Sequence, residues 1–442
     1  MSTITPVGQR FSSELTTLAT LVDSERPGWT RRALSEFDIA GRDYARTLMK
    51  QAGLQTRVDG AGNVIGVLPG RLGGREIMLG SHTDTVDGGG RFDGITGVLG
   101  AIEVVRLLRE NDIRLDHDLV IVVFFNEEPN DFGFFCVGSR AMTGLVDRTT
   151  LAATDTSGRS LAEALPDSGI DPEAFLDARY DFSKVTAFLE LHIEQGPELE
   201  RMGRQIGVVE TITGINHFKA LFTGRQDHAG TTPMDVRADA GCAAAGTVLA
   251  VESIAESGTN TRGTSGQIQF TPEAVNVVSA NASVEGEFRG PEGSWLNEAQ
   301  RRLTDAANQN ADKRGVHVEM EWTTDDAPVP LHEPITSTIA EVADELGHSR
   351  ATMFSGAGHD AGIIAAKTQV GMIFVPSHDG RSHCPEEFTE LDDIVPGIEV
   401  LLQTVLRLDG APPRRCYRFR CDCTVRWSTV AVTTVSADTT VC

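Results

Sequence analysis

The chain has 442 residues, enough for about two or three domains of ordinary size. Its 63 acidic and 39 basic residues give a net charge of −24, which argues against nucleic acid and anionic membrane surfaces as partners. No apolar run approaches the ~20 residues that span a bilayer, and the first residues lack the pattern of a signal peptide. We therefore expect a cytoplasmic protein with reduced cysteines.

The first part of the chain is predicted to alternate helices and strands. Residues 37–53 carry apolar side chains at helical spacing and end in a glycine typical of a C-cap. Residues 63–68, 77–79 and 119–125 indicate strands, and the last is a continuous apolar run typical of a strand buried on both faces. Residues 99–110 predict a crossover helix. This pattern favours a parallel or mixed sheet flanked by helices.

A different pattern begins near residues 207–214. Residues 217–224 alternate polar and apolar side chains, as a half-exposed antiparallel strand does. The further elements expected in this part cover residues 237–257, 267–270, 275–278, 283–289, 295–314 and 316–322. The α/β pattern resumes from Leu331, with elements expected at 333–346, 370–375 and 391–408. The middle part is therefore predicted to be a small α+β domain inserted into a larger α/β domain.

The predicted domain boundaries follow from this change of pattern. Residues 1–212 and 329–410 are expected to form the larger domain, and residues 213–328 the inserted one. Residues 411–442 are first basic and rich in cysteine, and then a low-complexity stretch of Thr, Val and Ser. We expect this tail to be a disordered extension without a function of its own.

Segment 80–94 holds the first candidate metal ligands. His82 and Asp93 stand eleven residues apart in a glycine-rich loop between a predicted strand and a predicted helix, where open α/β sheets place their sites. Asp84 is placed to accept the other ring N–H of His82 and to select its tautomer. The alternative of a phosphate-binding loop at Gly88–Gly90 is disfavoured, because the Lys-Ser/Thr of such loops is absent.

Other segments carry compatible side chains. Glu127 and Glu128 follow the buried strand directly, and consecutive residues point to opposite sides, so one could bind a metal while the other reaches a water. His192 lies in another strand-like run, and His383 follows the strand predicted at 370–375. His228 lies in the inserted domain.

The motifs around these residues occur in a specific order. They are His82-x-Asp84 with Asp93-Gly, Asn126-Glu-Glu, Leu191-His-Ile-Glu-Gln-Gly-Pro, Asp227-His-Ala-Gly-Thr-Thr-Pro-Met and Gly380-Arg-Ser-His. With them the chain resembles the aminoacylase and carboxypeptidase superfamily, whose members use two co-catalytic metals. Within it, the chain is similar to the branch of N-carbamoyl-L-amino-acid hydrolases, β-ureidopropionases and allantoate amidohydrolases. The resemblance covers about residues 10–408.

The resemblance implies two divalent metal ions per subunit. His82 and His192 would hold one metal each, Asp93 would bridge them, and Glu128 and His383 would complete the ligand shells. Imidazoles and carboxylates of this kind suit Zn²⁺, Mn²⁺, Co²⁺ or Ni²⁺. The residual positive charge of such a site favours a substrate with a carboxylate.

The resemblance also assigns catalytic and binding roles. Glu127 would be the general base that takes a proton from the attacking water. His228 would stabilise the oxyanion from the partner subunit of a homodimer. Arg289, with Asn276 beside it, matches the family residues that bind the substrate carboxylate, and a guanidinium suits such a two-point contact. The further pocket candidates are Gln195 and His359.

The implied fold is a three-layer α/β/α catalytic domain with an inserted ferredoxin-like lid and dimerisation domain. The implied reaction is hydrolysis of an N-carbamoyl-L-amino acid to the amino acid, CO₂ and ammonia; allantoate, β-ureidopropionate or an N-acyl compound is the alternative substrate. A catalytically silent binding protein is disfavoured, since no ligand is missing. One departure bears on substrate preference: the branch usually continues Glu-Glu-Gly-(Ser/Ala)-Arg-Phe, whereas this chain has Pro129-Asn-Asp131-Phe132. The histidines without motif support are expected to be structural or surface residues: His217, His317, His332, His348 and His378.

Overall fold

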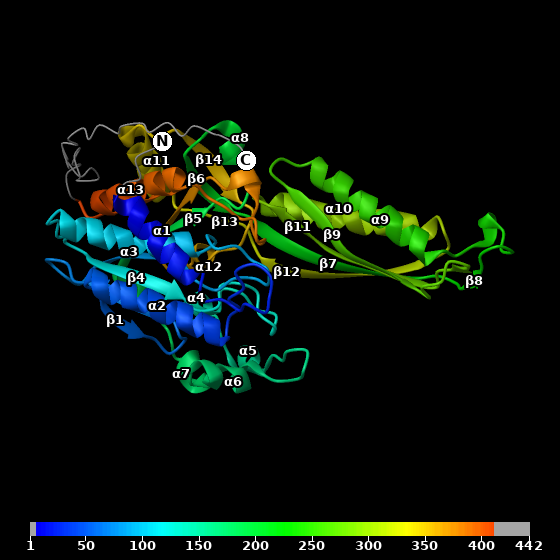
Figure 1. Cartoon of the computed structure of the whole chain (residues 1–442). Helices are drawn as coiled ribbons and strands as arrows, with labels where there is room; N and C mark the ends of the chain where they lie inside the picture. The colour runs from blue at the N-terminus through cyan, green and yellow to red at the C-terminus, as the bar shows by residue number, and fades with distance from the viewer. Residues whose placement is uncertain (1–5, 411–442) are drawn as a thin grey trace, which may run out of the picture.

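The computed structural model describes residues 6–410, which form a larger body and an elongated second lobe (Figure 1). The tail at 411–442, expected to be disordered, lies outside the described residues. Among residues 6–410, no helix is both long and apolar enough to cross a membrane.

The larger body is built on a nine-stranded mixed sheet, as the sequence predicts. Its strand order is β1-β2-β4-β3-β5-β15-β6-β13, and β14 pairs with β6. The bounds are β1 (Gln55–Val58), β2 (Val64–Leu68), β3 (Glu76–His82), β4 (Asp118–Phe124), β5 (Val185–Ile193), β6 (Ile206–Ile212), β13 (Val329–Pro330), β14 (Arg350–Ser355) and β15 (Val370–Val375). The neighbouring strands β4, β3, β5 and β15 run parallel. Their carboxyl ends therefore share one edge of the sheet.

Side chains of the central strands alternate between two hydrophobic clusters, one on each face. Ile77 and Leu79 belong to the cluster covered by the long helices, whereas Met78 belongs to the opposite one. The long helices are α1 (Pro6–Leu18), α2 (Glu36–Ala52), α3 (Ile95–Glu110), α11 (Glu333–Leu346) and α13 (Leu391–Leu408). The second face is covered in part by α4 (Val137–Thr143), α8 (Glu198–Met202) and α12 (Asp360–Ile364). This arrangement confirms the predicted three-layer α/β/α fold.

The short helices α5 (Arg148–Ala152), α6 (Leu161–Ala164) and α7 (Pro172–Leu176) surround a smaller apolar cluster of their own. This cluster includes Phe125, which directly follows β4, and partly buried Phe132 and Phe134 pack against it. The segment that follows the Glu127-Glu128 pair is thereby fixed to the body of the protein.

The second lobe contains a separate four-stranded antiparallel sheet of order β12-β7-β11-β9. Its elements are β7 (Gly214–Thr223), α9 (Ala240–Glu256), β9 (Arg262–Thr271), β11 (Asn281–Gly290), α10 (Gly293–Asp312) and β12 (His317–Asp326). The chain order βαββαβ with this strand order is ferredoxin-like, as the resemblance implies. Because the lobe lies between β6 and β13 of the large sheet, it interrupts the larger fold in sequence.

A small two-stranded antiparallel sheet forms the far end of this lobe (Figure 1). It consists of β8 (Asp227–His228) paired with β10 (Val277–Val278). The strand expected at residues 275–278 is therefore shorter than predicted and pairs outside the four-stranded sheet.

Candidate metal centre and substrate pocket

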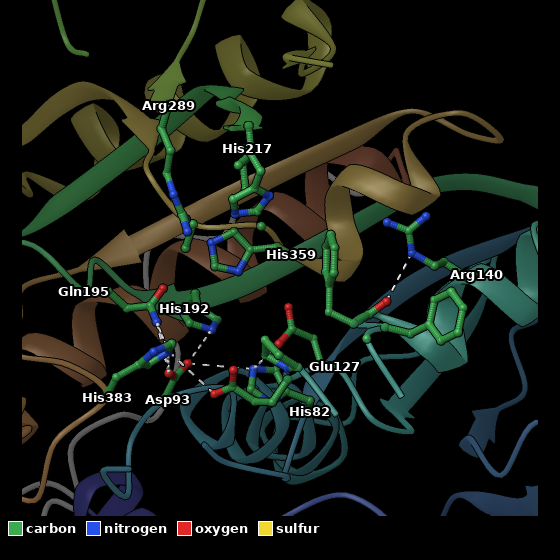
Figure 2. A pocket seen from close by; sticks show the side chains of 18 residues that line it. His82, Asp93, Glu127, Arg140, His192, Gln195, His217, Arg289, His359 and His383 are labelled. Carbon is green, nitrogen blue, oxygen red and sulfur yellow. Dashed lines mark hydrogen bonds and ion pairs between the residues drawn. The ribbon is translucent and has the colours of Figure 1, made fainter. Parts of the chain in front are cut away.

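The candidate ligands converge at the shared edge of the large sheet (Figure 2). His82 is the last residue of β3, His192 lies at the end of β5, and Asp93 lies two residues before the start of α3. Gly94, at the start of that helix, has φ 65°, and a Cβ there would stand 2.4 Å from Nε2 of His82. The Asp-Gly pair of the motif is thus required by close packing against the histidine ring.

Asp93 stands at the centre of the candidate ligands. Its Oδ1 lies 3.2 Å from Nε2 of His192 and 3.7 Å from Nε2 of His82. Its Oδ2 lies 3.1 Å from Nε2 of His383, which is 3.6 Å from Oε1 of Glu128. The ligand atoms therefore form two groups that share Asp93: one with His82 and His192, the other with Glu128 and His383.

This geometry does not match the expectation that His82 and His192 hold one metal each. Both imidazoles face the same oxygen of Asp93, because β3 and β5 are adjacent parallel strands that end side by side. The two groups are better described as two histidines plus Asp93, and Asp93 plus Glu128 and His383.

The electrostatics of these groups fit divalent cations. Burial raises the pKa of Asp93, but its hydrogen bonds with His192 and His383 outweigh this and hold that pKa well below its ordinary value. Burial, followed by the charge of Asp93, raises the pKa of Glu128 to about 8. Among the described residues, the buried Oε1 of Glu128 has no hydrogen-bond partner. Because a buried carboxylate oxygen without a partner is costly, a cation in this position would stabilise the site.

Backbone carbonyls select the histidine tautomers. Nδ1 of His192 lies 2.9 Å from the carbonyl oxygen of Ile193, and Nδ1 of His82 lies 3.1 Å from the carbonyl oxygen of Asp84. Both imidazoles therefore direct Nε2 toward Asp93. The carboxylate expected to orient His82 is farther away, at 3.6 Å from Nδ1.

The carboxylate of Asp84 instead holds the glutamate pair. It accepts hydrogen bonds from the backbone N–H groups of Glu127 and Glu128, at 3.3 and 3.0 Å. Asp84 therefore links the end of β3 to the segment that follows β4.

Glu387 connects the two loops that carry Asp93 and His383. The sequence analysis does not predict a role for it. Its Oε1 accepts hydrogen bonds from the backbone N–H groups of Phe92 and Asp93, at 2.8 and 3.1 Å. Its Oε2 accepts one from Ser382, at 2.8 Å, next to His383. The side chain is buried. The Pro-Glu-Glu sequence shortly after His383 is the only signal in the chain that points to it.

Glu127 points into the pocket from the side of His82 (Figure 2). Its Oε2 lies 3.6 Å from Nε2 of His82, and its Oε1 accepts a hydrogen bond from the thiol of Cys136 at 3.4 Å. Burial raises the pKa of Glu127 well above its ordinary value, while the nearby His82 opposes this shift. Glu127 and Glu128 thus face different neighbours, as their adjacent positions predict.

The pocket has a volume of about 560 Å³ and opens between the larger body and the second lobe. Residues from both parts of the molecule line it. The body contributes the five candidate metal ligands and further residues, namely Glu127, Gln195, Pro129, Gly133, Phe134, Phe135, Arg140 and the loop Ala357–His359. The lobe contributes Ile215, His217 and Arg289. The structure therefore brings most of the predicted site residues together in one cavity.

Arg289 is placed by both parts of the molecule. Its guanidinium contacts Glu287 through Nε and Nη2, at 2.6 and 3.2 Å, and donates to the carbonyl oxygen of Gly356 at 2.9 Å. His217 is an exposed residue, as expected; it also lines the pocket and lies 3.0 Å from Glu287. Its position two residues after Ile215, on the same face of β7, is the signal that could have found it.

Gln195 and His359 also lie where the sequence analysis expects them. Gln195 donates from Nε2 to Oδ2 of Asp93 at 3.0 Å, while its buried Oε1 has no hydrogen-bond partner among the described residues. His359 is buried, and its Nε2 lies 2.8 Å from the hydroxyl of Ser355. Burial lowers the pKa of His359 well below its ordinary value, so its ring is neutral at pH 7.

His228 and Asn276 do not line the pocket of their own chain. Both lie at the two-stranded sheet at the far end of the lobe: His228 is in β8, Asn276 directly precedes β10, and the N–H of Ala229 donates to the carbonyl oxygen of Asn276 at 3.0 Å. Arg289 lies near the opposite end of β11, which begins at Asn281. At the usual rise per residue, eight residues of strand span about 26 Å. Within one chain, Asn276 therefore does not stand beside Arg289, and its proximity to a substrate-binding arginine stays a prediction.

Comparison with known proteins agrees with this architecture. The model of peptidase family M20/M25/M40 matches residues 78–407, more than half of the chain. The chain belongs to this family. It is therefore a hydrolase, and the match includes all five candidate metal ligands.

Individual relatives extend along nearly the whole chain. An N-carbamoyl-L-amino acid amidohydrolase of Geobacillus stearothermophilus is 35% identical over 402 residues, covering 91% of this chain and 98% of the relative. A ureidoglycolate hydrolase of Arabidopsis thaliana is 35% identical over 408 residues, covering 90% and 86%. A solved amidase of the hydantoinase/carbamoylase family from Burkholderia multivorans superimposes with a TM-score of 0.85 at 32% identity, covering 93% of this chain and 100% of that one.

Proposed function

We propose that the protein hydrolyses the ureido C–N bond of N-carbamoyl-L-amino acids with the help of two divalent cations. The observation that carries this proposal is the pair of ligand groups that share Asp93 at the floor of a pocket. The name of the Geobacillus relative, N-carbamoyl-L-amino acid amidohydrolase, describes a substrate of this class. Allantoate or another acyclic ureido acid is the alternative, which the Arabidopsis relative favours.

His82 and His192 would hold one cation with Asp93, and Glu128 and His383 would hold the other with the same Asp93. Bound cations would polarise the ureido carbonyl and lower the pKa of water. Glu127 would accept a proton from the attacking water at its carboxylate and deliver it to the leaving nitrogen. The new C–O bond replaces the C–N bond to the amino acid. The remaining carbamate decomposes to CO₂ and ammonia, so that atoms and charge balance.

Arg289 and Gln195 would orient the substrate. The guanidinium of Arg289 is fixed by Glu287 and Gly356 at the wall of the pocket, where it would contact the substrate carboxylate. The unpartnered Oε1 of Gln195, close to Asp93, would accept a hydrogen bond from a ureido N–H. Binding energy at both ends would position the carbonyl for attack.

We further propose that a second copy of the chain completes the site. His228 and Asn276 are far from the pocket of their own chain but belong together at one tip. Large apolar side chains near this tip are exposed, namely Met234, Val236 and Val275. The edge strand β9 is also open on one side, and its Ile268 and Phe270 are exposed. Open edges and apolar patches of this kind are typical of interfaces.

The test is hydrolysis by protein stripped with EDTA and then reconstituted with Zn²⁺, Mn²⁺, Co²⁺ or Ni²⁺. Stripped protein should be inactive, and reconstituted protein should release ammonia and the free amino acid from N-carbamoyl-L-amino acids. Allantoate and ureidoglycolate are assayed in parallel. Faster turnover of either of these would favour the alternative, and an active protein without any bound transition metal would contradict the two-cation proposal.

A further inference from the structure

The segment that departs from the family pattern, Pro129-Asn-Asp131-Phe132, belongs to a tightly bonded loop at the pocket wall, residues 129–135. The side chain of Asn130 accepts hydrogen bonds from the backbone N–H groups of Phe132 and Phe134, at 2.9 and 3.1 Å. Its amide donates to Oδ1 of Asn126 at 2.6 Å, and its backbone N–H donates to the carbonyl oxygen of Phe134 at 2.9 Å. The substituted residue Asn130 therefore determines the conformation of the loop.

A salt bridge and a backbone bond fix the two sides of this loop. Asp131 lies 2.6 Å from Arg32, which also contacts Asp87 at 2.7 Å. The N–H of Cys136 donates to the carbonyl oxygen of Glu127 at 2.7 Å. The loop thus presents its side chains to the pocket in one defined arrangement.

Phe135 is the aromatic residue of this loop that lines the pocket and belongs to none of the hydrophobic clusters of the described residues. Two neighbours contact its ring. The guanidinium of Arg140 stands 4.8 Å from the ring centroid, and Nε of Arg140 donates to the carbonyl oxygen of Phe135 at 3.1 Å. A Cβ on Gly358 would come within 3.3 Å of the ring.

The same loop that Phe135 approaches also contacts Arg289. Gly358 meets the ring, and the carbonyl oxygen of Gly356 accepts the hydrogen bond from Arg289. Two Cα atoms separated by one residue lie no more than about 7 Å apart. Arg289 and Phe135 therefore meet the same short loop two residues apart, and both line the pocket. A substrate whose carboxylate meets Arg289 would extend along this loop toward Phe135.

Several apolar residues line the same pocket as Phe135. They are Pro129, Phe134, Ile215, Ala357 and Gly358. Apolar walls favour apolar groups, and they reject polar groups that would lose their hydrogen bonds to water.

We propose that Phe135 is a specificity-determining residue that selects N-carbamoyl amino acids with a large apolar side chain. This inference rests on the proposed function and adds to it the chemical class of the substrate. Phe135 and its apolar neighbours form the side-chain subsite, and the 129–135 loop holds it in place.

The experiment compares kcat/KM for five substrates on metal-reconstituted protein: the N-carbamoyl derivatives of glycine, leucine, phenylalanine, asparagine and aspartate. Leucine and asparagine have nearly the same size but differ in polarity, and glycine reports general damage to the site. The wild type should prefer leucine to asparagine, and phenylalanine to glycine, by about tenfold or more. Phe135→Ala should lower the phenylalanine-to-glycine ratio by about tenfold, and Phe135→Leu should retain most of it.

Phe132→Ala is the matched control, since Phe132 belongs to the same loop but packs against the body and does not line the pocket. It should leave the ratio unchanged whatever its effect on stability. A wild type that prefers asparagine or aspartate to leucine would overturn the inference and point to Arg140 as the recognising group. An unchanged ratio in Phe135→Ala would also overturn it. If no substrate were hydrolysed, glycine derivative included, the proposed function would fail as well.

Discussion

Glu127 and Glu128 are neighbours in the chain but contact different partners. Oε1 of Glu128 faces His383 in the group that includes Asp93, whereas Oε2 of Glu127 faces His82 and its Oε1 meets Cys136. Only Glu128 has an oxygen positioned together with two other ligand atoms. The pair therefore separates into one candidate ligand and one candidate base.

Replacing each glutamate by glutamine should separate these roles. Glu127→Gln should keep both cations but lose turnover by about 10²–10⁴-fold, the usual contribution of a general base. Glu128→Gln should lose metal as well as activity, because it removes an anionic ligand. Elemental analysis of the purified variants, together with turnover after reconstitution, measures both effects. If Glu128→Gln retained its metals and Glu127→Gln did not, the roles would be reversed.

Among individual residues, the sequence predicts those that stand in short, recognisable motifs. His82, Asp93, Glu128, His192 and His383 stand in short motifs, and the structure brings them together. Glu387 was missed because its bond to Asp93 joins residues 294 positions apart, which no local pattern reveals. Asn276 shows the opposite case: it is near Arg289 in sequence but separated from it in the same chain by the length of β11.

The elements that carry the site depend on Glu387 for their relative position. It joins the segment before α3 to the loop after β15, and it is packed against Gly90, where a Cβ would stand 2.1 Å from Oε1. This contact explains the glycine at that position.

Glu387→Ala should destabilise the protein and weaken metal binding. Two buried N–H groups would lose their acceptor, at a cost of about 2–5 kcal/mol in the free energy of unfolding. Glu387→Gln keeps an acceptor and a donor of the same shape and should restore most of the loss. Thermal unfolding of the metal-free protein and metal content after dialysis are the measurements.

Glu386→Ala is the control for this change. Glu386 is exposed and pairs with Arg381 at 3.0 Å, so its loss should change stability by no more than about 0.5 kcal/mol. Equal effects of Glu386→Ala and Glu387→Ala would contradict a positioning role for Glu387.

Most elements could be predicted because their apolar periodicity reflects burial. The central strand β4 and the amphipathic α13 agree with the expected ranges to within a residue or so. The strands that were missed have weaker signals: β1 is mostly exposed, and β14 mixes buried and partly exposed positions. The sequence pattern changes at β6 and so indicates a domain boundary there. In the structure β6 is an integral strand that pairs with three strands of the large sheet.

On the scale of the whole molecule, the site is divided between two parts of the fold. The large sheet supplies the candidate ligands, and the near end of the inserted lobe supplies Arg289 and His217. The far end of that lobe carries His228 and Asn276 (Figure 1). In the dimer that we propose, each tip would complete the pocket of the partner, and two-fold symmetry would make the two contacts equivalent.

Mixing two inactive variants tests this arrangement. Glu127→Gln and His228→Ala should each be inactive alone, but a heterodimer has one site with both groups intact. Random exchange at equal amounts should restore about one quarter of wild-type activity. The double variant Glu127→Gln/His228→Ala, mixed with either single variant, is the control and should restore nothing. With subunit exchange verified by mass, persistent inactivity would show that His228 does not act across the dimer.

The position of the two-stranded β8–β10 sheet has a consequence for how the protein behaves on dilution. If the tip of one chain completes the pocket of another, a separated chain is inert even when it is folded and loaded with metal. Specific activity would then fall as the protein is diluted below the dissociation constant of its dimer, and initial rates would rise with the square of the amount added. Abundance would set not only how much catalyst is present but whether each copy is a catalyst at all.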